Sequence, residues 1–313
     1  MKSAPRRHFL SIHDLTVAEV DGLFRLAAEV KGEPVVFREA LAGKTLALIF
    51  QKPSTRTRVS FEAGMAQLGG QGLFLSPRDL QLGRGETVED TAKVLSRYVD
   101  GIVARTYAHQ DLVDLARFGS VPVINGLSDD LHPCQALADY FTLREIFGEL
   151  RGRKIAYVGD GNNMAHSLAF GAAKVGMDLA LASPAGYEVS PRYLELARAD
   201  AAAAGTEIAA LRDPAAAVAG ASAVYTDVWA SMGQESEAEK RRRDFAGFMV
   251  DAALMGRALP EAVFLHCLPC HRGEEAAAEV VDGPQSRVFD QAENRLHVQK
   301  AVLLWLLAGY PLA

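Results

Sequence analysis

A dense group of hydroxyl and guanidinium side chains lies in the run Gln51-Lys52-Pro53-Ser54-Thr55-Arg56-Thr57-Arg58. The run follows a short apolar stretch, Leu46–Phe50, and opens an amphipathic stretch, which predicts a strand leading into a helix N-terminus. Free amides and the helix dipole attract anions there, and arginine pairs its donors with phosphate oxygens. A capped helix with solvated arginines is the structural alternative, but three hydroxyls beside two arginines favour a phosphate site. The run is no Walker A loop, because the glycines of that loop are absent.

A second polar group stands where two further elements begin or end. Arg105 directly follows the predicted strand Gly101–Ala104. His132-Pro133-Cys134-Gln135 opens a helix predicted to run to Phe147. His132 and Gln135 are one helical turn apart and can both point at a ligand. A structural hydrogen bond explains each residue taken alone. Their shared position near the ends of strands favours a ligand site.

Two stretches in the second half of the chain also follow predicted strands. Asp-Val-Trp-Ala-Ser-Met-Gly (227–233) places a carboxylate at the end of a strand and a glycine-ended loop beyond it. His-Cys-Leu-Pro-Cys-His-Arg-Gly (266–273) follows another strand and contains two thiols. We therefore expect both stretches at the same edge of a second sheet.

Some patterns in the second half admit other functions. Cys267 to His271 spell C-x-x-C-H, the haem c attachment pattern, which also contains a redox-type C-x-x-C, but no secretory signal accompanies them. Zinc is disfavoured because there is one cysteine pair and Cys134 lies in another segment. The Gly159–Asn163 turn resembles a dinucleotide turn, but Met164 replaces its third glycine, which argues against a nicotinamide dehydrogenase.

The overall composition is that of an ordinary globular protein. Of 313 residues, 49% are hydrophobic and 23% are charged, enough to bury two cores of domain size. The net charge of −6 disfavours nucleic acid as a partner, so any positive charge that binds an anion must be local. The arginine run at 241–243, flanked by acidic residues, is interpreted as a solvated helix face.

The sequence also bears on cellular location. No apolar stretch reaches the roughly 20 residues of a membrane span, and the N-terminus lacks the apolar part of a signal peptide. Three cysteines do not make a disulfide framework. We therefore expect a soluble, cytoplasmic protein with no membrane partner.

Short apolar stretches alternate with longer amphipathic ones along the chain. Strands are expected at Leu46–Phe50, Leu73–Leu75, Gly101–Ala104, Val121–Ile124, Ile155–Val158, Leu179–Ala182, Val224–Val228 and Val263–Cys267. This alternation predicts two α/β domains, each with a doubly wound parallel sheet covered on both faces. The boundary is expected near Gly148–Arg151, and the last helix at His297–Leu307. Such folds bind ligands at the carboxyl ends of strands, so the active site is expected in the interdomain cleft.

Taken together, these stretches resemble the transcarbamoylase family and, within it, the ornithine carbamoyltransferases. The matching pieces cover the whole chain in family order: Ser-Thr-Arg-Thr-Arg (54–58), His-Pro-Cys-Gln (132–135), Gly-Asp-Gly-Asn-Asn (159–163), Asp-Val-Trp-Ala-Ser-Met-Gly (227–233), His-Cys-Leu-Pro (266–269) and Glu-Asn-Arg (293–295). The first two mark transcarbamoylases in general. Ser-Met-Gly and His-Cys-Leu-Pro are the markers of the ornithine type.

The resemblance implies a division of labour along the chain. Residues 1–148 would bind carbamoyl phosphate, with a C-terminal helix at 297–313 packing back on them, and residues 149–296 would bind ornithine. The implied carbamoyl-phosphate ligands are Ser54, Thr55, Arg56, Thr57, Gln81, Arg105, His132, Gln135, Cys267, Leu268 and Arg295. The implied ornithine ligands are Asn163, Asp227, Ser231 and Met232. The family forms trimers or multiples of trimers with shared sites, and Gln81 resembles the residue that reaches a neighbouring subunit's site.

The implied reaction carries the carbamoyl group of carbamoyl phosphate to the side-chain amine of ornithine, giving citrulline and phosphate. Arg105 and His132 would stabilise the oxyanion, and no cofactor or metal is needed. The amine has a pKa of about 10.4, so it must lose a proton before it attacks. Cys267 beside Asp227 is the hypothesised pair that orients the amine and assists this loss.

Other readings of the resemblance stay open. The acceptor could be putrescine or an acylated ornithine, although Ser-Met-Gly favours free ornithine, and a non-catalytic binding paralogue is a further alternative. Cys270 is a departure, because alanine is expected there in the family. A disulfide between Cys267 and Cys270 that silences the enzyme is a hypothesis drawn from that departure. The direction of arginine metabolism is not fixed by the sequence.

Overall fold

A computed structural model describes residues 7–312 apart from 77, 79, 82–84 and 232. Its internal contacts divide the chain into two units. Unit 1 comprises the residues up to Leu137 together with those from Asn294 onward, and unit 2 comprises Ala138–Glu293. The first division falls inside α5 (Pro133–Phe147), and the second inside α12 (Val288–Ala308).

Unit 1 is built on a parallel sheet whose strands lie in the order β2-β1-β3-β4. Its elements are α1 (Val17–Gly32), β1 (Thr45–Phe50), α2 (Thr55–Gln67), β2 (Gln71–Leu75), α3 (Val88–Leu95), β3 (Gly101–Arg105), α4 (His109–Phe118), β4 (Val123–Leu127), the first turns of α5 and the greater part of α12. The order reverses at β1, which has β2 on one side and β3 on the other. Ligand-binding turns of doubly wound sheets lie at such a reversal.

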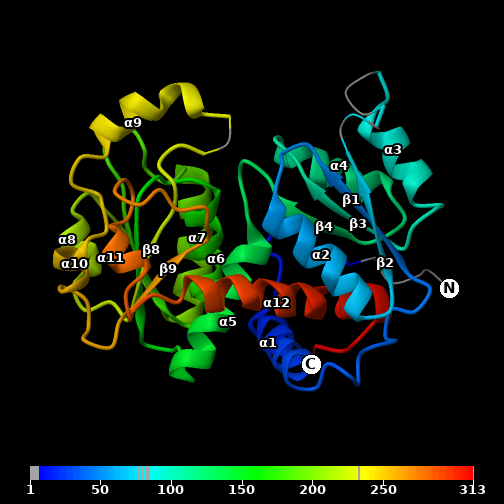
Figure 1. The fold of residues 1–313 in the computed structure, drawn as a ribbon, viewed down its shortest axis with the longest axis horizontal. Helices are drawn as coiled ribbons and strands as arrows, with labels where there is room; N and C mark the ends of the chain where they lie inside the picture. The colour runs from blue at the N-terminus through cyan, green and yellow to red at the C-terminus, as the bar shows by residue number, and fades with distance from the viewer. Residues whose placement is uncertain (1–6, 77, 79, 82–84, 232, 313) are drawn as a thin grey trace. The chain divides into compact units, whose positions relative to one another are not determined.

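Helices cover both faces of this sheet (Figure 1). On one face Ala47 and Ile49 of β1 pack with Leu112 and Leu115 of α4 in a buried cluster. On the other face Gly101 leaves room for α12, since a Cβ on it would lie 2.7 Å from Leu307. Strand residues that point to one face of the sheet and those that point to the other are therefore both buried. This explains why the strands are continuous apolar runs.

Side-chain caps define where the helices of unit 1 begin. Thr16 and Glu19 form a reciprocal capping box at α1, as the sequence predicts. Ser54 caps α2 by accepting from the Thr57 amide, and Thr87 caps α3 by accepting from the Asp90 amide. These caps fix the ends of the helices to within a residue.

Unit 2 repeats the same architecture with five parallel strands in the order β7-β6-β5-β8-β9. Its elements are the later turns of α5, then β5 (Lys154–Val158), α6 (Asn163–Val175), β6 (Asp178–Ala182), α7 (Pro191–Ala204), β7 (Ile208–Leu211), α8 (Pro214–Val218), β8 (Ala223–Thr226), a 3-10 turn η1 (Glu235–Glu237), α9 (Ala238–Asp244), α10 (Ala252–Met255), β9 (Val263–His266), α11 (Ala278–Val281) and the first turns of α12. The reversal here is at β5.

Both faces of the second sheet are also covered. A cluster rich in alanine and valine, including Val158, Val224 and Val281, joins one face of the sheet to α8, α10 and α11 (Figure 1). On the opposite side α5 approaches α6 so closely that a Cβ on Gly171 would lie 2.2 Å from the ring of Tyr140. The predicted class, two doubly wound parallel-sheet α/β domains, is confirmed.

Some predicted element boundaries are wrong. The strands predicted to reach Val228 and Cys267 end at Thr226 and His266, and α12 begins at Val288 rather than at His297. Strand β7 has no counterpart in the prediction, because Ile-Ala-Ala-Leu has one β-branched residue and two alanines, which are depleted in strands. Among the described residues no helix has the length and apolar character needed to span a membrane.

Candidate active site

The phosphate turn lies at the N-terminus of α2 in unit 1. The Ser54 hydroxyl accepts from the Thr57 amide at 3.2 Å and lies 3.0 Å from the Thr57 hydroxyl. Thr57 is fully buried, whereas Thr55 is exposed and Ser54 and Arg56 are intermediate. The first turn of α2 carries no acidic residue, so the positive end of its dipole is not neutralised locally.

The Thr57 hydroxyl is the centre of a cluster that joins four elements of unit 1. Arg295 of α12 donates to Thr57 Oγ1 at 3.0 Å and to Gln135 Oε1 of α5 at 2.7 Å. Arg105 at the end of β3 reaches the same Thr57 oxygen at 3.5 Å. Arg105 and Arg295 are each 4% exposed, so their charges lie in a region of low dielectric constant. Two buried cations around one hydroxyl favour an anionic ligand.

His132 is buried beside this cluster. Burial, followed by the charges of three neighbouring guanidinium groups, holds the pKa of His132 well below its usual range. The imidazole is therefore neutral at pH 7 and has one N–H donor. A neutral donor suits a carbonyl oxygen, which gains negative charge only in the transition state.

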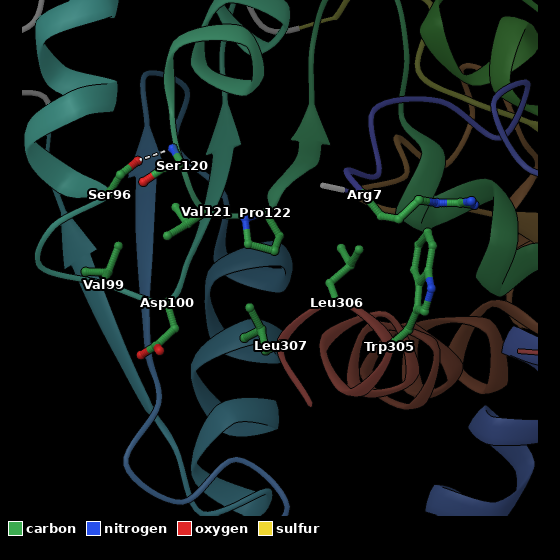
Figure 2. A pocket seen from close by; sticks show the side chains of 10 residues that line it. All are labelled: Arg7, Ser96, Val99, Asp100, Ser120, Val121, Pro122, Trp305, Leu306 and Leu307. Atoms are coloured by element: carbon green, nitrogen blue, oxygen red, sulfur yellow. Dashed lines mark hydrogen bonds between the residues drawn. The ribbon is translucent and has the colours of Figure 1, made fainter. Parts of the chain in front are cut away.

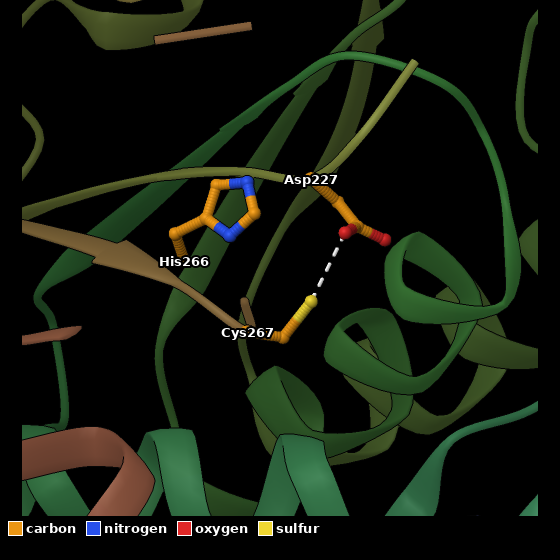
Figure 3. Close-up of side chains that lie close together, drawn as sticks. All are labelled: Asp227, His266 and Cys267. Carbon is orange, nitrogen blue, oxygen red and sulfur yellow. Dashed lines mark hydrogen bonds between the residues drawn. The ribbon is translucent and has the colours of Figure 1, made fainter. Parts of the chain in front are cut away.

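In unit 2 the end of β8 and the end of β9 lie side by side, with Thr226 paired to His266. The residue that follows each strand is a predicted site residue: Asp227 follows β8, and Cys267 follows β9. The Cys267 thiol lies 3.0 Å from Asp227 Oδ1, as Figure 3 shows, and Asn162 donates to Asp227 Oδ2 at 2.9 Å. Asp227 is 6% exposed. A carboxylate and a thiol are thus held together at the carboxyl edge of the sheet.

A second layer of bonds fixes the segment that carries Cys267. His266 Nδ1 accepts from the Leu268 amide at 2.8 Å, and Nε2 of the same ring lies 3.3 Å from Glu275 Oε1. Although burial opposes ionisation, hydrogen bonds from His266 and from the backbone of His271 lower the pKa of Glu275. Leu268 has φ of 58°, the one positive value among the described non-glycine residues. Such strain persists only where surrounding bonds hold it.

Three groups of potential metal ligands occur in the part of the chain that the structure describes. They are Asp227, His266 and Cys267; His266, Cys270 and Glu275; and His271, Glu274 and Glu275. Because His266 Nδ1 accepts the Leu268 N–H, the neutral ring carries its proton on Nε2. Neither nitrogen then offers a lone pair to a metal, so the first two groups do not form a suitable metal site.

Two models of one protein family match the chain, one over the residues around Thr57 and one over the residues around Asp227. A family model described as the carbamoyl-P binding domain of aspartate/ornithine carbamoyltransferase matches residues 7–145. The model described as the Asp/Orn binding domain of the same family matches residues 151–306. The chain belongs to the aspartate/ornithine carbamoyltransferase family.

Several relatives within this family are similar over nearly their whole length. A protein of Pyrococcus furiosus named "Ornithine carbamoyltransferase, anabolic" is 54% identical, covering 97% of each chain. A solved ornithine carbamoyltransferase from that organism superposes with a TM-score of 0.94 at 53% identity, covering 98% of this chain and 99% of the other. A solved acetylornithine transcarbamylase complexed with acetylcitrulline reaches a TM-score of 0.87 at 35% identity, covering 96% and 99%. The fold of a carbamoyltransferase therefore does not by itself select the acceptor.

The structure brings together most of the residues that the family resemblance implies. In unit 1 it gathers Ser54, Arg56, Thr57, Arg105, His132, Gln135 and Arg295. In unit 2 it gathers Asp227 and Cys267, with Leu268 beside them. The roles of these residues stay predictions.

Four predicted residues stand differently. Gln81 is exposed on the segment between β2 and α3, and within the described residues its side chain makes no hydrogen bond to the Thr57 cluster. Met232 lies outside the described residues. Ser231 is partly exposed, and its amide donates to Gln234 Oε1 at 3.0 Å. Asn163, also partly exposed, is the first residue of α6.

Two buried or bonded residues that the sequence did not single out lie next to predicted site residues. Lys52 is 4% exposed, forms an ion pair with Asp129 and lies 4.4 Å from the centroid of the Tyr107 ring. Asn162 caps α6 and bonds to Asp227 at once. The signal for Lys52 was available, since it stands inside the phosphate run.

The interpretation of Arg241 as part of a solvated helix face is wrong. Its side chain is 7% exposed and donates to Asp160 Oδ2 at 2.9 Å and to the Trp229 carbonyl at 2.6 Å. The sequence of α9 is polar on all sides, which suggested a solvated helix. The Arg241 side chain is nevertheless buried, because two acceptors lie beside it. Arg242, its neighbour, has a side chain that is 47% exposed and fits the interpretation.

A separate pocket of about 510 Å³ lies at the opposite edge of the first sheet (Figure 2). Its lining includes Asp100 and Pro122, which directly precede β3 and the start of β4, and Arg7 beside Trp305. Because parallel sheets of this class bind ligands at the carboxyl ends of their strands, this pocket is not the active site.

Proposed function

We propose that this chain transfers the carbamoyl group of carbamoyl phosphate to the side-chain amine of L-ornithine, giving L-citrulline and phosphate, within arginine metabolism. The observation that carries the proposal is the buried cluster of Arg105, Arg295 and Gln135 around Thr57 at a helix N-terminus. It supplies charge for a phosphate and neutral donors for a carbonyl in one place. Membership of the carbamoyltransferase family supports the same assignment.

In this proposal the phosphate lies on the α2 turn, held by Ser54, Thr55, Arg56 and Thr57. Arg105 and His132 donate to the carbamoyl oxygen, and Gln135 accepts from its amide, since a neutral N–H donor and an amide oxygen match those two ends. As the amine lone pair attacks the carbonyl carbon, that oxygen becomes an oxyanion. One donor aimed at it contributes about 3 kcal/mol to the barrier difference. The C–O bond to phosphate then breaks, phosphate leaves with the bonding electron pair, and the attacking nitrogen gives up its extra proton to the departing phosphate.

The acceptor side uses the opposite charge. Asp227 attracts the ammonium form of ornithine, and Cys267 lies close enough to it to relay a proton. Ornithine must enter the reaction as the neutral amine, so the rate rises with pH towards the amine pKa of about 10. Asn163, Ser231 and Met232 contact the amino-acid end in this proposal. No step requires a metal or a cofactor.

The proposal extends to organisation. Residues 1–148 with the C-terminal helix bind carbamoyl phosphate, and residues 149–296 bind ornithine. Gln81, Cys267 and Leu268 complete the carbamoyl site, with Gln81 supplied to a neighbouring subunit in a homotrimer or a multiple of trimers. The exposed position of Gln81 supports that assignment. Cytoplasmic residence belongs to the same proposal, and the free thiols Cys134, Cys267 and Cys270 are compatible with a reducing compartment.

The test is an acceptor panel. Purified protein is mixed with carbamoyl phosphate and either ornithine, N-acetylornithine, putrescine or aspartate, and ureido product and phosphate are measured from pH 7 to 9. Citrulline from ornithine alone, faster at higher pH, is the expected result. Product from N-acetylornithine instead would transfer the assignment to an acylated acceptor. Binding of carbamoyl phosphate without any product would indicate a non-catalytic paralogue.

A further inference from the structure

Arg241 is a buried cation of unit 2 on the short helix α9. It is not among the predicted ligand-binding residues. One of its guanidinium nitrogens donates both to Asp160 Oδ2 and to the Trp229 carbonyl, at 2.9 and 2.6 Å. Its Nε donates at 3.0 Å to Glu237, the residue that directly precedes α9. The guanidinium also stands 4.9 Å from the centroid of the Tyr187 ring. The side chain is thus fixed on several sides.

The two acceptors belong to the two segments that carry the proposed ornithine ligands. Asp160 lies in the turn after β5, which continues into Asn162 and Asn163. Trp229 lies in the loop after β8, between Asp227 and Ser231. The same two segments are joined a second time by the bond from Asn162 to Asp227 at 2.9 Å. Arg241 therefore ties together the backbone of one ligand segment and a side chain of the other.

Asp160 responds to this arrangement. Burial raises the pKa of Asp160 to about 6, while the adjacent Arg241 charge opposes that rise. At neutral pH the carboxylate is ionised and forms a charge-assisted bond with the guanidinium. Removing Arg241 leaves the buried Asp160 carboxylate without its ion-pair partner, which is costly.

We propose that Arg241 is a positioning residue for the amino-acid substrate, holding the loop of residues 227–231 in register with the turn of residues 159–163. This inference rests on the proposed function, because that function assigns ornithine to these two segments. Arg241 touches no substrate in this proposal. It sets the spacing between the Asp227 carboxylate and the residues that contact the rest of the amino acid.

The planar guanidinium of Arg241 is what this role requires, because Nη1 donates to Asp160 and Trp229 while Nε donates to Glu237. A guanidinium can hold a carbonyl and a carboxylate in fixed directions, whereas an ammonium carries its charge at a single point. Arg241→Lys therefore keeps the charge and loses the geometry. Arg241→Gln loses both.

The experiment compares these two variants with Arg242→Gln. Arg242 is the next residue on α9 and is also ion-paired, with Glu239 and Glu274, but its side chain is 47% exposed. For each protein, KM for ornithine, KM for carbamoyl phosphate, kcat and the thermal unfolding temperature are measured.

For Arg241→Gln the expected result is an ornithine KM raised tenfold or more, which corresponds to one lost hydrogen bond between charged groups. KM for carbamoyl phosphate stays within about twofold, because its proposed ligands in unit 1 are untouched. Arg241→Lys is intermediate, and Arg242→Gln matches wild type. An ornithine KM within twofold of wild type in a folded Arg241→Gln would overturn the proposal, as would an equal rise in both KM values.

A second measurement covers the case in which Arg241→Gln does not fold. The chain has two tryptophans, so Trp305→Phe leaves Trp229 as the sole indole reporter on the loop. In that background, Asp160→Asn keeps an acceptor for Arg241 but removes the charge. We expect it to shift the Trp229 emission and weaken ornithine binding. An unchanged spectrum and affinity would contradict the proposal. Wild-type inactivity with ornithine would instead contradict the proposed function and leave the Trp229 arm readable.

Discussion

The two groups of candidate site residues, one in each unit, have opposite local charge on scaffolds of the same design. Each is built where a doubly wound sheet reverses its strand order, from the turns that follow neighbouring strands. In unit 1 the end of β3 and helix α12 supply Arg105 and Arg295, which lie around the Thr57 hydroxyl. In unit 2 the turns gather Asp227 with a thiol, and Asp160 nearby. The net charge of the whole chain, −6, describes neither half. Local charge at the strand ends is what distinguishes a phosphate site from an amine site.

The largest expected effect comes from removing a cation from the Thr57 cluster. Arg105→Ala should lower kcat by a factor of about 100–1000, because it deletes a donor to the developing oxyanion. Steady-state kinetics with both substrates measure it. Lys93→Ala is the matched control, since the Lys93 side chain is 55% exposed and pairs with Glu89 on the surface of α3. Equal losses in both variants would mean that the cluster contributes only general positive charge.

Removing the charge of Asp227 in unit 2 should change the KM for ornithine and leave the binding of carbamoyl phosphate unchanged. Asp227→Asn keeps the side-chain shape but removes the charge that attracts the ornithine ammonium, so ornithine KM should rise about 10- to 100-fold. Binding of carbamoyl phosphate alone, measured by calorimetry, should not change. Asp282→Asn, at an exposed ion pair with Arg272, serves as the control. Weakened carbamoyl-phosphate binding in Asp227→Asn would contradict the division of charge.

The pH dependence of the two halves should differ. His132 has a depressed pKa, so it stays neutral from pH 6.5 upward and its donor is present throughout. KM for carbamoyl phosphate should therefore be flat between pH 6.5 and 9, while kcat/KM for ornithine rises as the amine loses its proton. His132 becomes protonated, and its neutral form is lost, only well below pH 6.5. A titration near pH 7 in the carbamoyl-phosphate profile that vanishes in His132→Asn would show that this assignment is wrong.

The smallest expected effect is at Cys270. Burial and the neighbouring Glu275 carboxylate raise the pKa of the Cys270 thiol to about 12, so it remains protonated and is a poor nucleophile at pH 8. Cys270→Ala should leave activity within about twofold of wild type. If peroxide joins Cys267 to Cys270, it takes two hydrogens from the thiols and is reduced to water, and Cys270→Ala should then resist the inactivation. Equal inactivation of both proteins would remove the disulfide hypothesis.

The sequence predicts the strand–helix alternation because the core strands are apolar runs and helices such as α1, α2 and α3 begin at a capping residue. It also locates the phosphate turn, since Ser54 and Thr57 act within one helical turn. What it misses is long-range. Arg241 meets Asp160 far along the chain, and the arginine run looks solvated until that carboxylate is placed beside it.

The early start of α12 was missed for a related reason. Its first turns carry Gln291 and Asn294, which are both fully buried, so the apolar period of a helix is absent there. Gln291 is accommodated by bonds to Asp139 and to the His266 amide. Periodicity detects burial of apolar groups, and a polar residue buried through specific partners escapes it.

The place of Arg295 in the Thr57 cluster has a consequence for synthesis. The residue belongs to unit 1, yet the ribosome makes all of unit 2 before it makes Arg295. The phosphate cluster therefore remains one cation short during most of translation, and its closure is a contact of high sequence separation. Nascent unit 1 lacks Arg295, so we expect an anion to stabilise it less before the chain is almost finished than afterwards.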